Sequence, residues 1–364
     1  MKNTSLILVL FIAVCTVVSS CHKDPEPQYG YAPKDPSAYN NLKKIEDFIK
    51  KNETKFQVFT IDATKDVMIT SQNGIKYNIP AYAFETSSGM PATGNITISI
   101  KEILDPADMI LSNKPTLASN GNILVSSGEF LVKAQQNNQN LRMRLDSGQI
   151  QRAIKIAMKN QSKNIADIPL WDGDTSLTFT QSGYNSENIM ITKSTNIPLP
   201  KGVSWDQLFG KNAVADPDTV RFVLPDIFTW VNCDWLYSYP GVKTTVLCYF
   251  ENEFNNETAT NSKGTEANMC FFRPENSNSV IKFFGKIFDA PKGKEGFVSY
   301  QNMMPVGVKG TFLAITVKDE KFYCESKVVT IEAPAAGKTY FPVSFQLKEV
   351  TETELLNTIK SMNQ

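Results

Sequence analysis

Residues 67–79 have the sequence VMITSQNGIKYNI, in which two short apolar runs flank a polar turn. Val67–Thr70 and Ile75–Ile79 are rich in β-branched and aromatic residues and follow the strand period of two. Asn73-Gly74 lies between them, and this dipeptide is a strong hairpin signal because both residues tolerate a positive φ. The stretch therefore predicts an antiparallel β-hairpin.

Similar runs extend on both sides of this hairpin: Phe56–Ile61, Ile96–Ile100, Gly121–Val125, Glu129–Ala134, Leu141–Leu145, Ala153–Met158 and Ser176–Thr180. Many short strands with turns between them indicate a sandwich or barrel. Ahead of them, Ser37 can cap a short helix in which Leu42, Ile45 and Phe48 recur at helical spacing. We predict a first β-sandwich domain over residues 38–181, with this helix packed on it.

The second half repeats the pattern after a break. A stretch rich in Ser, Asn, Pro and Gly predicts a linker or a long excursion over residues 182–217, with one helical turn at Trp205–Phe209. A second β domain is predicted over residues 218–348, from runs at Thr219–Leu224, Ile227–Tyr237, Thr244–Phe250, Met269–Phe272, Val280–Phe284, Gly310–Val317, Lys321–Cys324, Lys327–Ile331 and Tyr340–Leu347. Thr351-Glu-Thr-Glu354 is a capping box that opens a C-terminal helix within residues 349–364. The predicted fold class is mainly β, with two tandem antiparallel β-sandwich-like domains and short helices at both ends.

The N-terminus carries an export signal. Lys2 precedes the apolar run Ser5–Val18, which is too short for a bilayer span of about 20 apolar residues. Val18-Ser-Ser-Cys21 resembles the bacterial lipobox, and this resemblance implies a signal peptide over residues 1–20 and a lipid on Cys21. Residues 21–37 are Pro-rich and charged, as in an extended tether. We therefore predict an outer-membrane lipoprotein of the cell envelope, on the periplasmic face or the cell surface, with the membrane as partner through its lipid anchor.

Composition excludes several classes of function. The 364 residues include one histidine, His22, which lies in the tether. Without an imidazole the folded part cannot carry out Ser–His or Cys–His catalysis or bind zinc through histidine. Lys plus Arg and Asp plus Glu both total 37, so there is no basic footprint for nucleic acid. Phosphate-binding and nucleophile-elbow motifs are absent from the sequence as well. We therefore expect no enzyme activity, cofactor or metal.

The segment Asn73–Phe84, followed by Gly89–Ile98, resembles the β-sandwich module of ankyrins, netrin receptors and zonula-occludens proteins. A family of Bacteroidetes lipoproteins carries a similar module, and this chain resembles that family also at Asp108–Leu111, Leu124–Phe130 and Ile227–Tyr237. The likeness to the module covers residues 58–145. It implies a β-sandwich that makes protein contacts. The His–Ser pair used for autoproteolysis next to such modules has no counterpart here, because the domain holds no histidine.

The cysteines leave two alternatives open. Apart from Cys15 in the signal and Cys21, they are Cys233, Cys248, Cys270 and Cys324, all in the second half. In an exported protein these four allow two disulfides with three possible pairings. The alternative is four buried free thiols. A zinc site is disfavoured because the spacings include no CxxC.

The segment Trp230–Tyr237 is the most aromatic in the chain and supplies the candidate site. As a strand it places Trp230, Asn232 and Asp234 on one face and Trp235 on the other. We interpret this segment as mainly structural, with Asn232 and Asp234 buried against hydrogen-bonding partners that fix a junction, because unpaired buried polar groups are costly. The alternative is a recognition surface in which the aromatic rings stack on sugars.

These features favour a non-catalytic envelope lipoprotein that acts as a binding or structural module toward an envelope protein or glycan. One alternative is a pilin-like, adhesive surface subunit, although a C-terminal helix argues against a C-terminal donor strand. The other is a carbohydrate-binding or glycan-active lipoprotein that uses Asp234 or Glu129. That activity requires an open aromatic-lined groove with two carboxylates about 5–10 Å apart.

Overall fold

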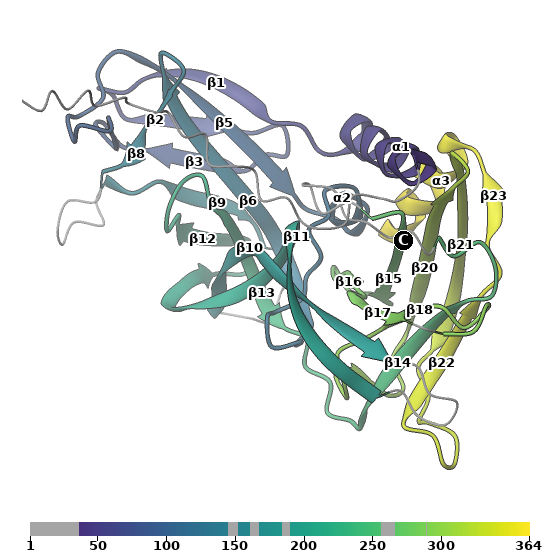
Figure 1. Cartoon of the computed structure of the whole chain (residues 1–364). Coiled ribbons are helices and arrows are strands. Elements are labelled where there is room, and N and C mark those ends of the chain that lie inside the picture. The colour runs from purple at the N-terminus through teal and green to yellow at the C-terminus, as the bar shows by residue number, and fades with distance from the viewer. Residues whose placement is uncertain (1–35, 145–151, 161–166, 184–189, 256–265, 289) are drawn as a thin grey trace, which may run out of the picture. The chain divides into compact units, whose positions relative to one another are not determined.

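In a computed structural model, the described part of the chain comprises residues 36–144, 152–160, 167–183, 190–255, 266–288 and 290–364. It is mainly β, with antiparallel sheets and short helices near both ends of the described chain, so the predicted fold class is confirmed in these respects (Figure 1). The largest sheet has a main path that begins β1 (Gln57–Asp62), β5 (Asn95–Ile103), β6 (Leu124–Gln136), β13 (Trp230–Leu236) and β10 (Asp167–Gly183). It continues with β11 (Met190–Ala215), β12 (Thr219–Val223), β9 (Lys155–Lys159), β3 (Lys76–Ile79) and β2 (Val67–Thr70).

The predicted hairpin is present as β2 and β3, which pair antiparallel from Val67 opposite Ile79 to Thr70 opposite Lys76. Gly74 has a φ of +78°, and the Ile75 carbonyl accepts a hydrogen bond from the Ser71 amide. The turn chemistry of Asn73-Gly74 therefore sets the register, as the sequence predicts.

The two ends of this strand order are joined by side chains. The Gln72 amide on the β2–β3 turn donates to Gln57 Oε1 on β1, at 2.7 Å. Tyr77 on β3 donates its hydroxyl proton to Glu102 on β5, also at 2.7 Å. The sheet therefore curls around its own apolar face, which buries Ile69, Tyr77, Ile79, Ile98, Ile100, Phe130, Ile156, Phe222 and Val231 in one core.

The predicted linker over residues 182–217 is wrong for its described residues. Residues 190–215 form β11, which pairs antiparallel with β10, and residues 184–189 lie outside the described part. Trp205 is fully buried and donates its indole N–H to the Pro115 carbonyl at 2.9 Å, in a strand where we predicted a helical turn. Polar composition suggested a linker because polar side chains indicate exposure to solvent. It does not exclude a strand, because a strand forms through backbone hydrogen bonds.

The predicted boundary at residue 218 does not separate the strands either. β12 pairs with β9, and β13 pairs with β6 and β10, so residues 219–236 complete the sheet of the first half. Strand β17 (Gly285–Phe288) also runs parallel to the end of β10. By their contacts, the described residues from Pro36 to Gln364 belong to one compact unit.

A second core lies between two groups of strands from the second half. A five-stranded sheet has the order β16 (Ile281–Lys282), β15 (Asn268–Pro274), β20 (Lys309–Lys318), β21 (Lys321–Thr330) and β23 (Lys348–Val350). Strand β14 (Lys243–Phe250) pairs in parallel with β22 (Tyr340–Phe345) and antiparallel with β18 (Gly296–Val298) and β19 (Met304–Pro305). Val246 and Phe250 of β14 share a core with residues of the five-stranded sheet. Among these are Phe272 of β15 and Phe312 of β20, and the centroids of these two rings lie 4.4 Å apart. The shorter strands are β4 (Phe84–Glu85), which pairs with β8 (Arg142–Met143), and β7 (Gln139–Asn140), which pairs with β6.

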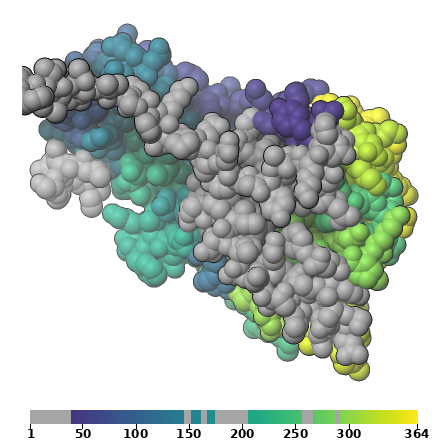
Figure 2. Space-filling model, in the orientation of Figure 1, coloured from purple at the N-terminus to yellow at the C-terminus, as the bar shows by residue number. Residues whose placement is uncertain are grey.

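The helices α1 (Pro36–Asn52), α2 (Pro106–Leu111) and α3 (Glu352–Lys360), with the 3-10 turn η2 (Ser361–Asn363), cover the other face of the five-stranded sheet. Ile45 and Phe48 of α1 lie in one cluster with Ile103 of β5 and with Leu313 of β20. The helix therefore packs on the first domain as predicted, but it also packs on the five-stranded sheet, which was not predicted. Lys51 of α1 pairs with Glu352 of α3 at 2.6 Å, where Figure 2 shows the purple helix against the yellow C-terminal segment. An amphipathic stripe predicts that a helix is buried, not which sheet buries it.

The capping box is confirmed, because the Glu354 amide donates to Thr351 Oγ1 and the Thr351 amide donates to Glu354 Oε2. The predicted signal peptide over residues 1–20 lies outside the described residues, as does the tether over 21–37 except for Pro36 and Ser37, which begin α1. No helix in the described part of the chain has both the length and the apolar character needed to cross a bilayer.

Candidate functional site

Strand β13 carries the predicted site residues between two neighbours. Asn232 lies opposite Glu129 of β6 on one side and opposite Trp171 of β10 on the other. Val231 and Cys233 point into the core that the curled sheet encloses. The alternate positions, 230, 232 and 234, therefore face the other side of the sheet.

This other face holds a polar cluster that is closed to solvent. Ser126, Glu129, Asn232 and Asp234 are all buried to within 1% of full burial. The Ser126 hydroxyl donates to Asn232 Oδ1 at 3.1 Å, and the Asn232 amide group donates in turn to Asp234 Oδ2. The expectation that Asn232 and Asp234 are buried against hydrogen-bonding partners is thus confirmed, apart from one oxygen of Asp234.

A bulge in β6 builds the cluster. The register shifts between Asn232 and Asp234, so that Asp234 lies opposite Ser126 while residues 127 and 128 form the extra length. Gly128 there has a φ of +150°, and an added Cβ would lie 2.8 Å from the Phe130 ring and 2.9 Å from Leu104. Only glycine fits this close approach, and its amide donates to Ser126 Oγ at 3.0 Å.

Three carboxylate oxygens of the cluster accept no hydrogen bond from any described group: both oxygens of Glu129 and Oδ1 of Asp234. Burial raises the pKa of Asp234 to about 8, although hydrogen bonds from Ser126, Asn232 and the Ser127 amide oppose the shift. Burial and the neighbouring charge of Asp234 raise the pKa of Glu129 well above its usual range, against the opposing charge of Lys114. At neutral pH Asp234 is therefore held largely in its uncharged form, and burial also disfavours the charged form of Glu129.

Lysines and a further glutamate extend this polar region. Lys114 is buried, and its Nζ lies 5.2 Å from the centroid of the Trp230 ring. Lys282 donates to Asn113 Oδ1 at 2.9 Å, and Lys286 lies 3.9 Å from Glu266 Oε1. Burial lowers the pKa of both Lys282 and Lys286.

The structure therefore brings Trp230, Asn232 and Asp234 together with Glu129 on one face of the sheet. Trp235 lies apart from them, because it packs against the core that the curled sheet encloses. A glycosidase carboxylate must touch its sugar, whereas neither Glu129 nor Asp234 has any exposed surface. The arrangement lets these groups fix the β6–β13 pairing and gives them no access to a solvent-borne substrate.

Sequence reasoning missed a cavity of about 340 Å³ in the second half of the chain. It is lined by residues 250–255 and by Lys292, Gly293, Glu295 and Lys318. Glu251, Glu253 and Glu295 give it acidic groups, two lysines give it basic ones, and Phe254 gives it an aromatic ring. The polar run Glu251–Asn256 after an apolar strand is a loop signal, but nothing in the sequence shows which other loop it meets.

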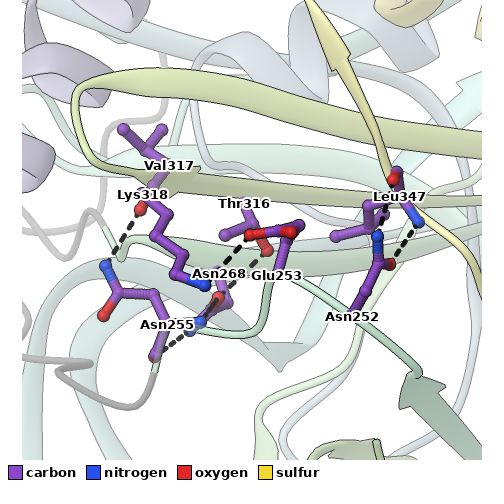
Figure 3. Close-up of polar contacts among 8 residues, drawn as sticks. All are labelled: Asn252, Glu253, Asn255, Asn268, Thr316, Val317, Lys318 and Leu347. Atoms are coloured by element: carbon purple, nitrogen blue, oxygen red, sulfur yellow. Dashed lines mark hydrogen bonds and ion pairs between the residues drawn. The ribbon is translucent and has the colours of Figure 1, made fainter.

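Asparagines hold this loop in place (Figure 3). Asn252 exchanges two hydrogen bonds with the Leu347 backbone, at 2.9 and 2.7 Å. Asn255 and Asn268 are joined by two more, from the Asn255 amide to Asn268 Oδ1 and from Asn268 Nδ2 to the Asn255 carbonyl. Because these side chains are used internally, they rigidify the floor of the cavity and are not free for a ligand.

The same network reaches β20. Asn255 also donates to the Val317 carbonyl at 2.9 Å, Thr316 donates to Asn268 Oδ1 at 3.0 Å, and Lys318 pairs with Glu253 at 3.0 Å. Of the polar groups that line the cavity, Glu251 and Lys292 are exposed. These two side chains are the ones best placed to meet a ligand.

All four described cysteines are buried free thiols, so no disulfide joins Cys233, Cys248, Cys270 or Cys324 in this structure. They lie in three different cores: Cys233 in the first, Cys324 under the helices, and Cys248 and Cys270 together in the second-half core. This distribution rules out two disulfides in this fold. Within the described residues, no group of three or more His, Cys, Asp or Glu side chains could hold a metal ion.

Comparison of the chain with protein-family models, with curated proteins and with solved structures finds no match in any of the three. The resemblance to the module of ankyrins, netrin receptors and zonula-occludens proteins, and to Bacteroidetes lipoproteins, therefore stays a prediction from the quoted motifs.

Proposed function

We propose that this chain is a lipid-anchored, non-catalytic protein of the cell envelope that acts as a binding or structural module. The observation that carries this proposal is the enclosure of the candidate catalytic carboxylates, Glu129 and Asp234, in the protein interior. The absence of histidine from residues 23–364 supports it, because the commonest acid–base and nucleophilic sites need an imidazole. The lipobox-like Val18–Cys21 supports the anchor.

The anchor is tested by Cys21→Ala. The substitution removes the thiol that would carry the lipid, so we expect loss of labelling by a radioactive fatty acid and release of the protein from the membrane fraction. Cys15→Ala, inside the signal segment, is the matched control and should leave both readouts unchanged. Equal membrane recovery of Cys21→Ala and wild type would contradict the lipoprotein assignment.

A second candidate function, carbohydrate binding, is favoured by the cavity beside residues 250–255. Its rigid floor, exposed carboxylate and ammonium groups and the Phe254 ring suit a polar ligand with an apolar face, as in a sugar. An adhesive, pilin-like role would also need an external contact surface, and such contacts would fall on the exposed loops.

A glycan array tests this second candidate. The double variant Glu251→Ala/Lys292→Ala removes two exposed cavity groups of opposite charge, and Glu332→Ala/Lys338→Ala removes the same charges from an exposed loop elsewhere. We expect the wild type and the loop variant to bind the same glycans and the cavity variant to lose at least tenfold in affinity. Equal binding by all three proteins would contradict the cavity assignment.

A further inference from the structure

Two cysteines enter the same core from strands of different sheets. Cys248 lies on β14, where Val343 of β22 and Phe297 of β18 flank it. Cys270 lies on β15 of the five-stranded sheet, opposite Ala314 of β20. Both thiols are fully buried and belong to one apolar cluster, so the two sheets face each other across them.

The two thiols share one buried cluster, and each lies close enough to affect the other. Burial raises the pKa of the Cys270 thiol well above its usual range, and a hydrogen bond between the Cys270 and Cys248 side chains adds to the shift. The other thiols have different surroundings. Cys233 packs in the core of the first sheet beside Asp234, and Cys324 makes a hydrogen bond with the Thr358 side chain of α3.

We propose that Cys248 and Cys270 form a thiol–disulfide site whose oxidation crosslinks the two facing sheets, while Cys233 and Cys324 stay thiols. Of the pairings open to four cysteines, this one alone joins neighbours in the structure. It places one covalent bond at the centre of the second-half core, between a strand of the largest sheet and a strand of the five-stranded sheet. The proposal does not depend on what the protein binds, and it requires that the protein meets a disulfide oxidant.

The oxidant is a disulfide, either of a small thiol or of a thiol–disulfide oxidoreductase. One cysteine loses its proton and attacks this disulfide, which gives a mixed disulfide and releases one thiol of the oxidant. The second cysteine, also deprotonated, attacks the mixed disulfide, so that the Cys248–Cys270 bond forms and the second thiol leaves. The protein loses two electrons and two protons, and the oxidant gains both.

Burial sets the order of events. A thiolate is the attacking species, and in the folded protein both thiols are shielded and Cys270 holds its proton tightly. We therefore expect the exchange to take place during folding, before the two sheets close, and the folded reduced protein to resist oxidation.

The test is refolding from denaturant in a buffer of oxidised and reduced glutathione, with a parallel sample in reduced glutathione alone. Free thiols are then blocked with N-ethylmaleimide under denaturing conditions, and the digest is mapped by mass spectrometry. We expect a linked peptide pair that contains Cys248 and Cys270, with Cys233 and Cys324 blocked. Blocking of all four cysteines in the oxidised sample, or a linked pair that contains Cys233 or Cys324, would overturn the proposal.

A stability readout tests the crosslink itself. Addition of dithiothreitol during unfolding should lower the melting temperature of the oxidised wild type by about 5 °C, because the bridge restrains the unfolded chain. Cys233→Ala/Cys324→Ala removes the same number of buried thiols and should keep this response, whereas Cys248→Ala/Cys270→Ala should lose it. An equal response of both double variants would contradict the assignment, and the peptide map of the wild type decides the pairing even where a variant fails to fold.

Discussion

At the scale of single residues, the cost of burying Asp234 is the most informative quantity. Its carboxyl has no exposed surface, and one of its oxygens has no hydrogen-bond partner among the described groups. A charged carboxylate there would be strongly unfavourable, which is why burial raises its pKa to about 8. A group so placed stabilises the fold when it is protonated and destabilises it when it is charged.

The stability that Asp234 contributes depends on pH, and the sign of this dependence follows from its raised pKa. The folded-state pKa lies above the unfolded value of 3.8, so the folded state binds the extra proton between about pH 4 and 8. The stability linked to Asp234 is therefore fully present below pH 4 and is lost as the pH rises through about 8.

Asp234→Asn should remove this dependence. Relative to wild type, the variant should gain stability from pH 6 to pH 9, on the order of 3 kcal/mol, in urea unfolding curves. Taking the difference between the two proteins cancels most of the opposing titration of Lys282 and Lys286, whose pKa values burial lowers. Glu332→Gln, at an exposed site, should show no such trend. A difference between Asp234→Asn and wild type that stays constant with pH would show that Asp234 titrates as in water.

At the scale of elements, β13 joins three of the hydrophobic clusters. Val231 and Cys233 pack in the first core, and Trp230 on the opposite face contacts both the helix-covered cluster and the small cluster around Trp205. Period-two alternation predicts which of these side chains share a face. It does not predict that β6 is the partner, because Ser126 and Asn232 are 106 residues apart in sequence.

Trp230→Ala should therefore destabilise the protein. Truncation of a large aromatic side chain costs about 3–5 kcal/mol, and we expect the lower end because Trp230 is only partly buried. Val328→Ala, where the side chain is 61% exposed, is the control and should change little. The measurement is the free energy of unfolding in urea. If Trp230→Ala unfolds like wild type but loses glycan binding, then β13 presents a recognition surface and its structural interpretation is wrong.

The same scale shows what the sequence could predict. The β2–β3 hairpin and the capping box of α3 are local, since each depends on residues within one turn, and both are confirmed. The packing of α1 on the five-stranded sheet depends on Leu313 and Phe322, far along the chain, and it was not predicted. Short-range signals in the sequence predict individual helices and strands. Which elements then pack together depends on contacts between residues that are far apart in the chain.

At the scale of the whole molecule, the predicted division into two domains at residue 218 does not describe the strand pairing. Strands β12 and β13, from the start of the predicted second domain, complete the sheet of the first half. The polar cluster of Glu129, Asn232 and Asp234 lies where β13 pairs with β6. The sequence marked Asp234 and Glu129 as candidate site residues. It did not predict that both are buried together, because this follows from the strand topology. The cavity beside residues 250–255 likewise arises from loops that converge only in the folded chain.

The central claim is that Glu129 and Asp234 are interior structural groups and not the carboxylates of an active site. Carboxyl labelling of the folded protein by a water-soluble carbodiimide and glycine ethyl ester, followed by peptide mass spectrometry, tests it most directly. We expect exposed Glu332 and Glu251 to be labelled rapidly, whereas Glu129 and Asp234 are labelled only after the protein is unfolded in urea. Labelling of Glu129 or Asp234 in the folded protein at the rate of Glu332 would contradict it.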